Sequence, residues 1–392
     1  MKKELTLLAA IFAGFPAVVL ADPPAPEAPK PAIPSLGDVL GASNITLTGY
    51  VDATYSYFDK NPYPNGIYGG TWEPARQFDY RENSFALSQA ALTASYLPTS
   101  GFGALVNMIA GSDGRVLRDS ELSNGNTTAS DFDVYQAFVQ YVGGPATLMA
   151  GKFATLAGAE TVNPTTDTTI SRSLLFTAME PLSHTGVRAA YAPNSMFTIT
   201  AGANNGWNYT SAPTANGSTI SGKTGELGIT VNPSKMFSLS GTVYSGQAPS
   251  ADGTGVKTLY DVVATINATD ALSFVVNGDY LTQDNNGVNG ASTTADGVAG
   301  YVNYAINGQW SVTLRGEYID DKDGALSGTT PMSNTLKEAS LDLNYTPTKN
   351  TMFLAEVRQD NSDKKLFDFN VNTGNPSATY QDSFELEAIY KF

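Results

Sequence analysis

Hydrophobic and polar residues alternate along most of the chain after Ile45, in segments about ten residues long. In the last segment, Asp382 to Phe392, every second residue from Phe384 is apolar and those between are mostly charged. A period of two predicts a β-strand whose two faces meet different surroundings. A C-terminal edge strand this apolar would favour aggregation in a soluble sheet. In a membrane barrel it would close the wall, with lipid outside and water inside.

The alternating segments are separated by two kinds of connection. Short, turn-forming sequences follow every second segment: Pro98 to Gly101, Gly143 to Pro145, Pro193 to Ser195, Asn232 to Ser234, Ala268 to Asp270, Asn307 to Gly308 and Pro347 to Lys349. Long polar stretches follow the others, for example Asp113 to Ser130, Tyr209 to Ser221, Asp284 to Thr294 and Asp320 to Asn334. We expect short and long connections to alternate strictly along the whole chain.

The number and sorting of these connections predict the fold. Seven short turns, with both chain ends on their side, give eight hairpins and about sixteen strands. An outer-membrane barrel has short periplasmic turns and long external loops, a sorting for which a soluble sandwich has no reason. We therefore predict an all-β, transmembrane, antiparallel up-and-down β-barrel whose last strand pairs with Ile45 to Phe58. Sixteen strands would enclose an aqueous channel.

The two faces of the predicted strands differ as lipid and water require. Trp310, Leu314 and Tyr318 alternate with Arg315 and Glu317, so a slip of one residue would put charges into lipid. Aromatic residues gather beside the short turns, as in the aromatic girdle of a membrane barrel. They are Tyr96, Phe102, Tyr141, Tyr191, Phe197, Trp310, Tyr345, Phe353 and Phe392.

The N-terminal residues predict export. Residues 1–21 have a basic start at Lys2 and Lys3, an apolar stretch, and small residues before a cleavage site after Ala21, as in a signal peptide. Residues 22–43 are rich in proline, and we expect an extended periplasmic lead-in there. The barrel would then occupy residues 44–392. No later segment has the roughly 18 consecutive apolar residues of a spanning helix.

Charge and cysteine content exclude several classes of function. The full chain has 22 basic and 37 acidic side chains, and removing the signal peptide leaves 20 and 36. So acidic a chain is a poor nucleic-acid binder and favours cations, although the charge could simply solvate external loops. The absence of cysteine excludes disulfides, thiol catalysis and cysteine metal sites.

The alternation is interrupted in the centre of the chain. The segment from Leu156 to Leu182 is too long for a turn and carries an apolar run from Leu174 to Phe176. An exposed loop has little reason to carry that run, whereas a loop folded into the lumen can pack it on the wall. We therefore predict a constriction loop at about residues 156–182.

This central stretch resembles a known family. The residues that carry the resemblance are Gly151-Lys152-Phe153, Gly158-Ala159-Glu160, Ser171 with Leu175-Phe176, Pro181, His184 to Arg188, Tyr191 and Asn205-Gly206-Trp207. Together they look like the OmpL-like β-barrel porin-2 family, and the resemblance covers nearly the whole mature chain. It implies an outer-membrane porin and says much less about the solute.

Charged residues on the lumen face and in the constriction loop are candidates for ion selectivity, because charge at a narrow point sets ion preference. On the wall they are Asp52, Lys152, Arg188, Asp279, Arg315, Glu317, Asp342, Glu356 and Arg358, and in the loop Glu160, Asp167, Arg172 and Glu180. The alternative is that these charges only solvate the lumen and pair with one another.

Enzymatic and metal-dependent functions find no support in the sequence. The single histidine, His184, follows Ser183 on a strand, so the two side chains point to opposite faces and cannot form a nucleophile–base pair. One histidine without cysteine provides no zinc site, and no phosphate-binding glycine loop occurs. The acidic segment Asp320 to Gly324 lacks the ligand spacing of a calcium loop. We expect no enzyme activity and no cofactor.

Three functional hypotheses follow. The first is a passive channel for small hydrophilic solutes or ions in the bacterial outer membrane. The second is a channel selective for one substrate class, such as anions, peptides or sugars. The third is a structural or adhesive barrel with a plugged lumen. The expected partners are outer-membrane lipid and lipopolysaccharide, the barrel-assembly machinery acting on the strand that ends at Phe392, and, by analogy with other sixteen-stranded porins, two further copies in a homotrimer.

Overall fold

The computed structural model describes residues 36–60, 76–79, 83–121, 130–215, 218–250, 253–326, 333–370 and 375–392. The chain divides into two units, residues 1–43 and 44–392. In the first unit the helix α1, Leu36–Ser43, is described. The predicted extended lead-in is therefore wrong for its last eight residues, which are helical. The predicted signal peptide lies outside the described residues.

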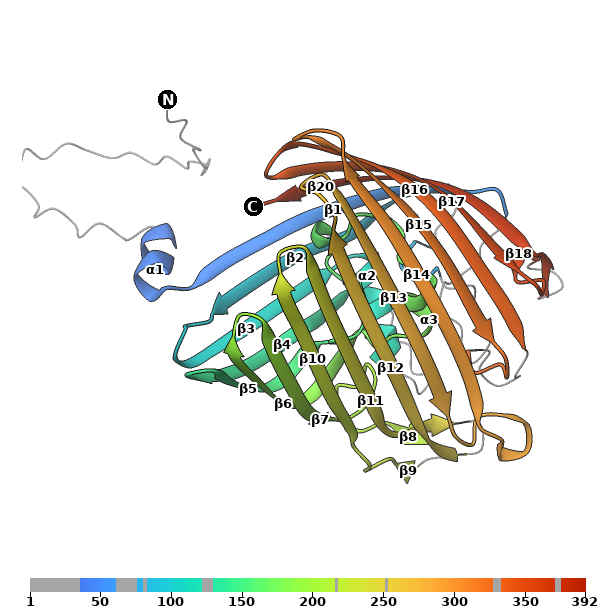
Figure 1. Ribbon diagram of the computed structural model, residues 1–392, viewed down its shortest axis with the longest axis horizontal. Helices are drawn as coiled ribbons and strands as arrows, with labels where there is room; N and C mark the ends of the chain where they lie inside the picture. Colours follow the sequence, from blue (N-terminus) through green and yellow to red (C-terminus); the bar gives the residue numbers. More distant parts are fainter. Residues whose placement is uncertain are drawn as a thin grey trace, which may run out of the picture. The chain divides into compact units, whose positions relative to one another are not determined.

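The second unit is a closed antiparallel barrel of sixteen strands (Figure 1). The strands of its wall are β1 Thr46–Phe58, β2 Ser84–Tyr96, β3 Gly101–Ala110, β4 Phe132–Gly143, β5 Ala146–Ala154, β6 Ser183–Asn194, β7 Phe197–Asn204, β10 Thr224–Ser234, β11 Phe237–Ser250, β12 Gly253–Asn267, β13 Leu272–Gln283, β14 Thr293–Ala305, β15 Trp310–Asp321, β16 Asn334–Thr348, β17 Thr351–Ser362 and β20 Tyr380–Lys391. Each strand pairs with its neighbours in chain order, and the predicted up-and-down barrel is confirmed.

The last strand closes the barrel against the first. The pairing of β20 with β1 runs from Tyr50 opposite Lys391 to Phe58 opposite Ser383, as the sequence predicts. Beyond this ladder, the Gly49 amide donates to the Phe392 carbonyl at 3.0 Å and the Phe392 amide donates to the Gly49 carbonyl at 2.9 Å. A Cβ atom at residue 49 would overlap the Phe392 ring, so glycine lets the chain end pack here.

The alternation of faces holds along the wall. On β15 and β16, Leu314 and Leu341 are exposed on the outer face, whereas Arg315 and Asp342 are fully buried on the inner face. The aromatic residues beside the short turns are also largely exposed, and Trp310 stacks on Tyr345 with ring centroids 4.3 Å apart. The described residues include no helix long and apolar enough to cross a membrane.

The connections follow the predicted sorting with one exception. All seven short turns occur within about two residues of their predicted positions, at one end of the barrel. At the other end, only residues 251 and 252 separate β11 from β12, so strict alternation of short and long connections is wrong there. These two strands are 14 and 15 residues long and extend further than their neighbours β10 and β13 instead of ending in a long loop.

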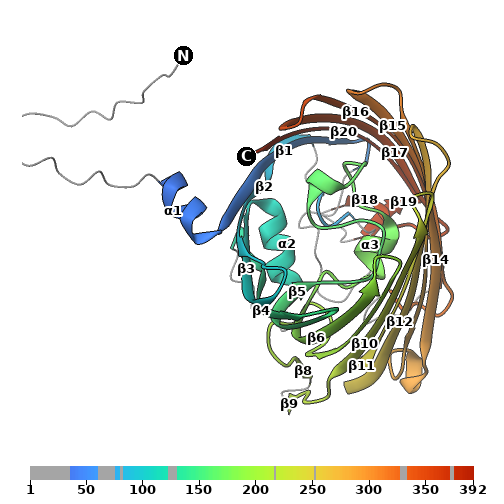
Figure 2. The ribbon, with the colours of Figure 1, turned by 60° about the vertical axis from the view of Figure 1, so that its left-hand side comes forward.

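Several long connections contain structure of their own. They include the small hairpins β8 Thr214–Ala215 with β9 Ser218–Thr219 and β18 Phe367–Asn370 with β19 Asn375–Ala378, the 3-10 turn η2 Val288–Gly290, and the helix α2 Ser112–Glu121. The polar stretch predicted as an external loop at Asp113 to Ser130 is thus partly wrong. Its first part is α2, which lies inside the ring of strands with Val116 and Leu117 buried (Figure 2).

Candidate functional site

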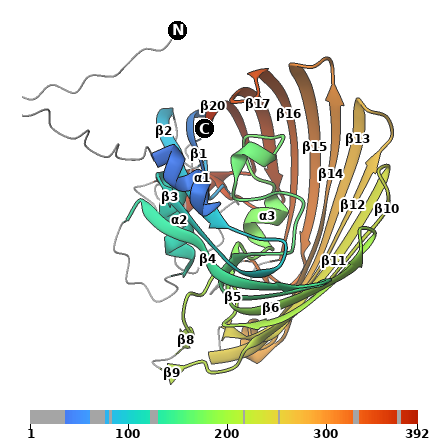
Figure 3. The same cartoon turned by 90° about the vertical axis from the view of Figure 1, so that its left-hand side faces the viewer.

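The connection between β5 and β6, residues 155–182, lies inside the barrel (Figure 3). We call it the inner loop. It contains the 3-10 turn η1, Pro164–Thr166, and the short helix α3, Leu174–Ala178. Asn163 and Ser173 precede these turns, and their side chains accept backbone hydrogen bonds as N-caps. The two caps fix where each turn begins.

Apolar side chains of the inner loop pack on opposite walls. Leu174, Leu175 and Met179 join a buried cluster with residues of β11 to β16. Phe176 and Leu182 join a second cluster with residues of β1, β3, β4 and α2. Each fully buried side chain of this size contributes about 1.5–3 kcal/mol. The inner loop is therefore held between two sides of the barrel.

Arg315 of β15 joins the middle of the inner loop to the wall. Its guanidinium donates to Glu160 Oε1 at 2.9 Å and to the Ser171 carbonyl at 2.7 Å in the loop. It also donates to both oxygens of Glu338 on β16, at 3.1 and 3.2 Å, and lies 3.4 Å from Glu317. Arg315 is only 1% exposed, so water screens these contacts little.

Arg358 of β17 repeats this arrangement two strands away. Its guanidinium donates to the Arg172 carbonyl at 2.7 Å and to Ser171 Oγ at 2.9 Å. On the wall it pairs with Asp360 at 2.6 Å. Ser171 therefore lies between two buried arginines, which hold the same turn of the inner loop from β15 and β17.

Carboxylates of the wall accept backbone N–H groups of the inner loop. Glu317 accepts from Leu174 and Leu175 at 3.0 and 3.3 Å, at the start of α3, where the helix offers unpaired amides. Glu356 accepts from Ser171 at 3.0 Å, and Asp342 accepts from the next residue toward the N-terminus at 3.1 Å. These charged acceptors make stronger hydrogen bonds than neutral ones.

Within the inner loop, Arg172 links residues of the loop to one another. It donates to the carbonyls of Thr161, Val162 and Ile170 at 2.9 to 3.3 Å and lies 3.2 Å from Asp167. Burial raises the pKa of Asp167 to about 7, against the opposing effect of Arg172. Arg172 therefore keeps the two limbs of the loop together.

The first limb of the inner loop is joined to further strands. Leu156 N–H donates to the Tyr244 hydroxyl of β11 at 2.8 Å, and Ala159 N–H donates to Asn277 of β13 at 2.7 Å. On the opposite side, Gln89 of β2 donates to the Val162 carbonyl at 2.8 Å. The inner loop thus crosses the lumen from β2 to β15 and β17.

The remaining wall candidates and the histidine make contacts of other kinds. Lys152 pairs with Asp133 of β4 at 2.9 Å. Arg188 donates to both oxygens of Glu226 on β10 at 2.6 and 3.0 Å. His184 stacks on Tyr244 with ring centroids 4.4 Å apart and is buried.

The selectivity candidates predicted from the sequence are largely buried, most of them in paired contacts. They include Lys152, Glu160, Asp167, Arg172, Glu180, Arg188, Arg315, Glu317, Glu356 and Arg358. Most of the candidates in the inner loop and on β15 to β17 belong to one network of contacts, whereas Lys152 and Arg188 lie outside it. A buried, paired charge can act on a passing ion only through its field.

Several buried charged groups escaped the sequence-based selection, among them Arg76 and Asp113. Arg76, from the connection between β1 and β2, pairs with Asp360 at 3.2 Å and also with Glu385. No sequence pattern around Arg76 indicates that it is buried. Asp113 of α2 accepts from Gln89 at 2.7 Å. The helix could have been recognised from Asp113 in its first turn and Arg118 in its last, which suit the helix dipole.

Threonines form the exposed part of the inner loop. Thr161, Thr166 and Thr168 are exposed, in contrast to the charged residues between and after them. At the short-turn end of the barrel, a cavity of about 360 Å³ opens beside Thr168. Its other walls come from β13, β14 and β15, including Ser273, Asn303 and Thr313. Of the inner loop, Thr168 lines this cavity, which Lys235 and Asp270 also border.

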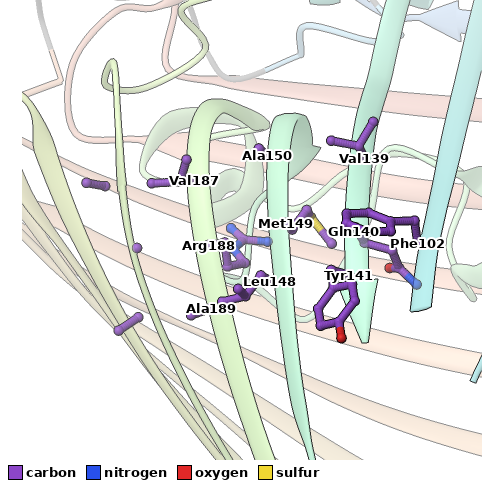
Figure 4. A pocket seen from close by; sticks show the side chains of 13 residues that line it. Phe102, Val139, Gln140, Tyr141, Leu148, Met149, Ala150, Val187, Arg188 and Ala189 are labelled. Carbon is purple, nitrogen blue, oxygen red and sulfur yellow. The ribbon is translucent and has the colours of Figure 1, made fainter. Parts of the chain in front are cut away.

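The outer wall has an apolar groove over β3 to β7, of about 630 Å³ (Figure 4). Small residues form its floor, among them Ala150, Ala189 and Ala201, and larger ones such as Phe102 and Val187 flank them. This groove lies on the outer face of the barrel wall, on the side of the sheet away from the inner loop.

Solved outer-membrane proteins share this fold. The outer membrane channel DcaP of Acinetobacter baumannii matches with a TM-score of 0.57 at 13% identity, covering 89% of this chain and 97% of that one. OmpT of Vibrio cholerae in its trimer form gives 0.59 at 10% identity, covering 89% and 99%. The anion-selective porin from Comamonas acidovorans gives 0.58 at 11% identity, also covering 89% and 99%. At these identities the likeness concerns the fold alone.

The comparison with curated proteins gives no match. A family model described as "beta-barrel porin-2, OmpL-like" matches residues 44–392, the whole barrel. The resemblance seen in the central stretch is confirmed: the chain belongs to the OmpL-like β-barrel porin-2 family of outer-membrane porins.

Proposed function

We propose that this porin lets small hydrophilic solutes and ions diffuse passively, along a path that the inner loop narrows. The observation that carries the proposal is the exposed threonine face of a loop otherwise fixed by buried contacts. Thr168 lies at a polar cavity of about 360 Å³ at the short-turn end, which we assign as one mouth of the path. A fixed loop with hydroxyl groups on its open side suits hydrated solutes of no single kind.

The charge of the lumen favours cations. Buried carboxylates outnumber guanidinium groups around the inner loop: Glu160, Asp167, Glu317, Glu338, Asp342, Glu356 and Asp360 surround Arg76, Arg172, Arg315 and Arg358. In a low-dielectric wall, fixed charge of one sign raises the local concentration of the opposite ions. We therefore propose a preference for cations, in contrast to the anion-selective porin from Comamonas acidovorans.

A plugged barrel is the competing function, because the inner loop packs on both sides of the lumen. Planar-bilayer recording separates the two. The purified mature protein should give discrete current steps, and a potassium chloride gradient should give a reversal potential toward that of potassium. The absence of current steps, at a protein density at which a control porin inserts, would refute the channel. A reversal potential toward that of chloride would refute the preference for cations.

We also propose how the protein reaches and occupies the membrane. Cleavage after Ala21 would release the mature chain, and the barrel-assembly machinery would recognise the strand ending at Phe392. The apolar outer face would contact lipid and lipopolysaccharide. The groove over β3 to β7 is proposed to join three copies, as its small residues allow close approach of sheets. Ala201→Trp should fill the groove and reduce trimers in native mass spectra, whereas Val298→Trp, on exposed β14, should not.

A further inference from the structure

Three buried carboxylates meet where the inner loop returns to the wall. Glu180 of the loop, Asp261 of β12 and Asp279 of β13 each place one oxygen within 4.8 Å of the others. Asp261 and Asp279 lie directly opposite each other in the strand register. Like charges in that position destabilise a sheet, and Glu180 adds a third. We call this group the acidic triad.

Most oxygens of the triad lack a hydrogen-bond donor within the described part of the chain. Neither oxygen of Glu180 or Asp279 accepts a hydrogen bond there, and Asp261 uses only Oδ2, which accepts from Asn277 at 2.8 Å. The three residues are 6%, 1% and 5% exposed. No ion pair within these described ranges includes them, although the carboxylates near Arg315 and Arg358 are paired. Burying charged groups without partners costs several kcal/mol.

We propose that the acidic triad binds one divalent cation, and that this cation is Ca²⁺. The donors are all carboxylate oxygens, which hard cations prefer, and the triad has no histidine or cysteine for a transition metal. Ca²⁺ holds oxygens at about 2.3–2.6 Å, so ligands on opposite sides of it lie about 5 Å apart. Mg²⁺ demands near-ideal octahedral geometry and usually keeps several waters, so three buried carboxylates suit Ca²⁺, whose coordination is more flexible.

The triad's position gives the cation a structural role. Arg315 and Arg358 fix the middle of the inner loop to β15 and β17, whereas Glu180 lies on the limb that returns to β6. Gly158, with φ of 93°, packs so closely that a Cβ there would overlap the Glu180 carboxylate. The outgoing limb therefore presses Glu180 toward β12 and β13, and Ca²⁺ would join both limbs to this wall.

Calcium titration of the refolded mature protein tests the proposal. The protein is prepared in detergent without lipopolysaccharide, stripped with chelator, and titrated calorimetrically with CaCl₂ or MgCl₂. One Ca²⁺ should bind per chain, more tightly than Mg²⁺. Glu180→Gln and Asp279→Asn should each weaken binding at least tenfold, and Asp363→Asn, an exposed acid elsewhere, should not. No saturable binding, unchanged binding in both triad variants, or tighter Mg²⁺ binding would overturn the assignment.

Thermal unfolding separates a lost ligand from a damaged fold. With saturating Ca²⁺, both triad variants should unfold at lower temperature than wild type. In chelator the order should reverse, because each variant removes one charge from a repelling group. Variants that are less stable in both conditions would contradict the site. Neither binding nor unfolding depends on current flow, so these results stand apart from the proposed channel function.

Discussion

Single buried arginines determine the position of the inner loop. The guanidinium of Arg315 donates to three residues of the inner loop, Glu160, Thr169 and Ser171. It also lies beside two carboxylates of the wall, Glu317 and Glu338. Such a group offers five donors in a rigid plane, which lysine could not replace. Its removal would leave several carboxylates buried without a cation.

Arg315→Met should destabilise the inner loop without unpairing the barrel. We expect a loss of about 3–5 kcal/mol in the free energy of unfolding, as for other broken buried pairs, and noisier single-channel currents. Lys322→Met removes an exposed pair with Asp296 and should cost no more than about 1 kcal/mol. Urea titration measures both. Equal losses in the two variants would contradict the anchoring role.

Asp113 of α2 should make stability depend on pH. Burial, with a further effect of the Asp52 charge, raises its pKa from 3.8 to about 7. The folded state thus favours the protonated form, so this contribution is full below pH 3.8 and is lost as pH rises through about 7. Each pKa unit corresponds to about 1.4 kcal/mol.

Asp113→Asn should therefore flatten the decline in unfolding free energy between pH 4 and 8, since the amide resembles the protonated acid. Asp363→Asn, at an exposed site, should keep the wild-type slope. Denaturant titrations at several pH values provide the comparison. A wild-type protein that gains stability over this range, or an unchanged slope in Asp113→Asn, would be inconsistent with the assigned burial.

The sequence predicts which residues carry charge into the lumen, but not what they contact. Alternation indicates the inward position of Arg315, because its neighbours Leu314 and Gly316 belong to the lipid face. Its partners lie up to 155 residues away in sequence, and only the path of the inner loop brings Glu160 to it. No local pattern encodes that meeting, and so the sequence alone indicates a role in selectivity for these charges.

At the scale of elements, the closing contact between β1 and β20 depends on one glycine. Gly49→Ala should crowd the Phe392 ring and weaken closure, because its Cβ would also approach the Ala91 carbonyl. Gly300→Ala is the matched control, as the nearest atom to its Cβ is 4.0 Å away. The folded fraction, measured by heat-dependent gel mobility, should fall only for Gly49→Ala. Equal folding of the two variants would show that closure tolerates the crowding.

Strands were predictable where two solvents impose alternation, and the burial of helices inside the lumen was not. The lipid-facing and lumen-facing positions of β15 and β16 can be predicted from the sequence, because lipid and water require different side chains. In α2, Val116 and Leu117 are buried within a charged segment whose polarity is typical of an external loop. Burial of that segment depends on β1, β3 and the inner loop together, so it cannot be read locally.

At the scale of the whole molecule, the wall of the barrel can be predicted from the sequence, whereas the lumen is built from long-range contacts. The barrel supplies a closed ring of strands, and two packed clusters and two arginines hold the inner loop across it. What faces the remaining space is a set of threonines rather than the charged residues. Ions should therefore pass beside Thr168.

Cysteine modification during single-channel recording tests this claim most directly, and the chain has no native cysteine to interfere. Thr168→Cys is compared with Ser195→Cys, at an exposed turn of the wall, before and after adding a cationic methanethiosulfonate reagent. Modification should lower the current step of Thr168→Cys by at least about a third and leave that of Ser195→Cys unchanged. Verified modification of Thr168→Cys with no change in current would contradict a path beside the inner loop.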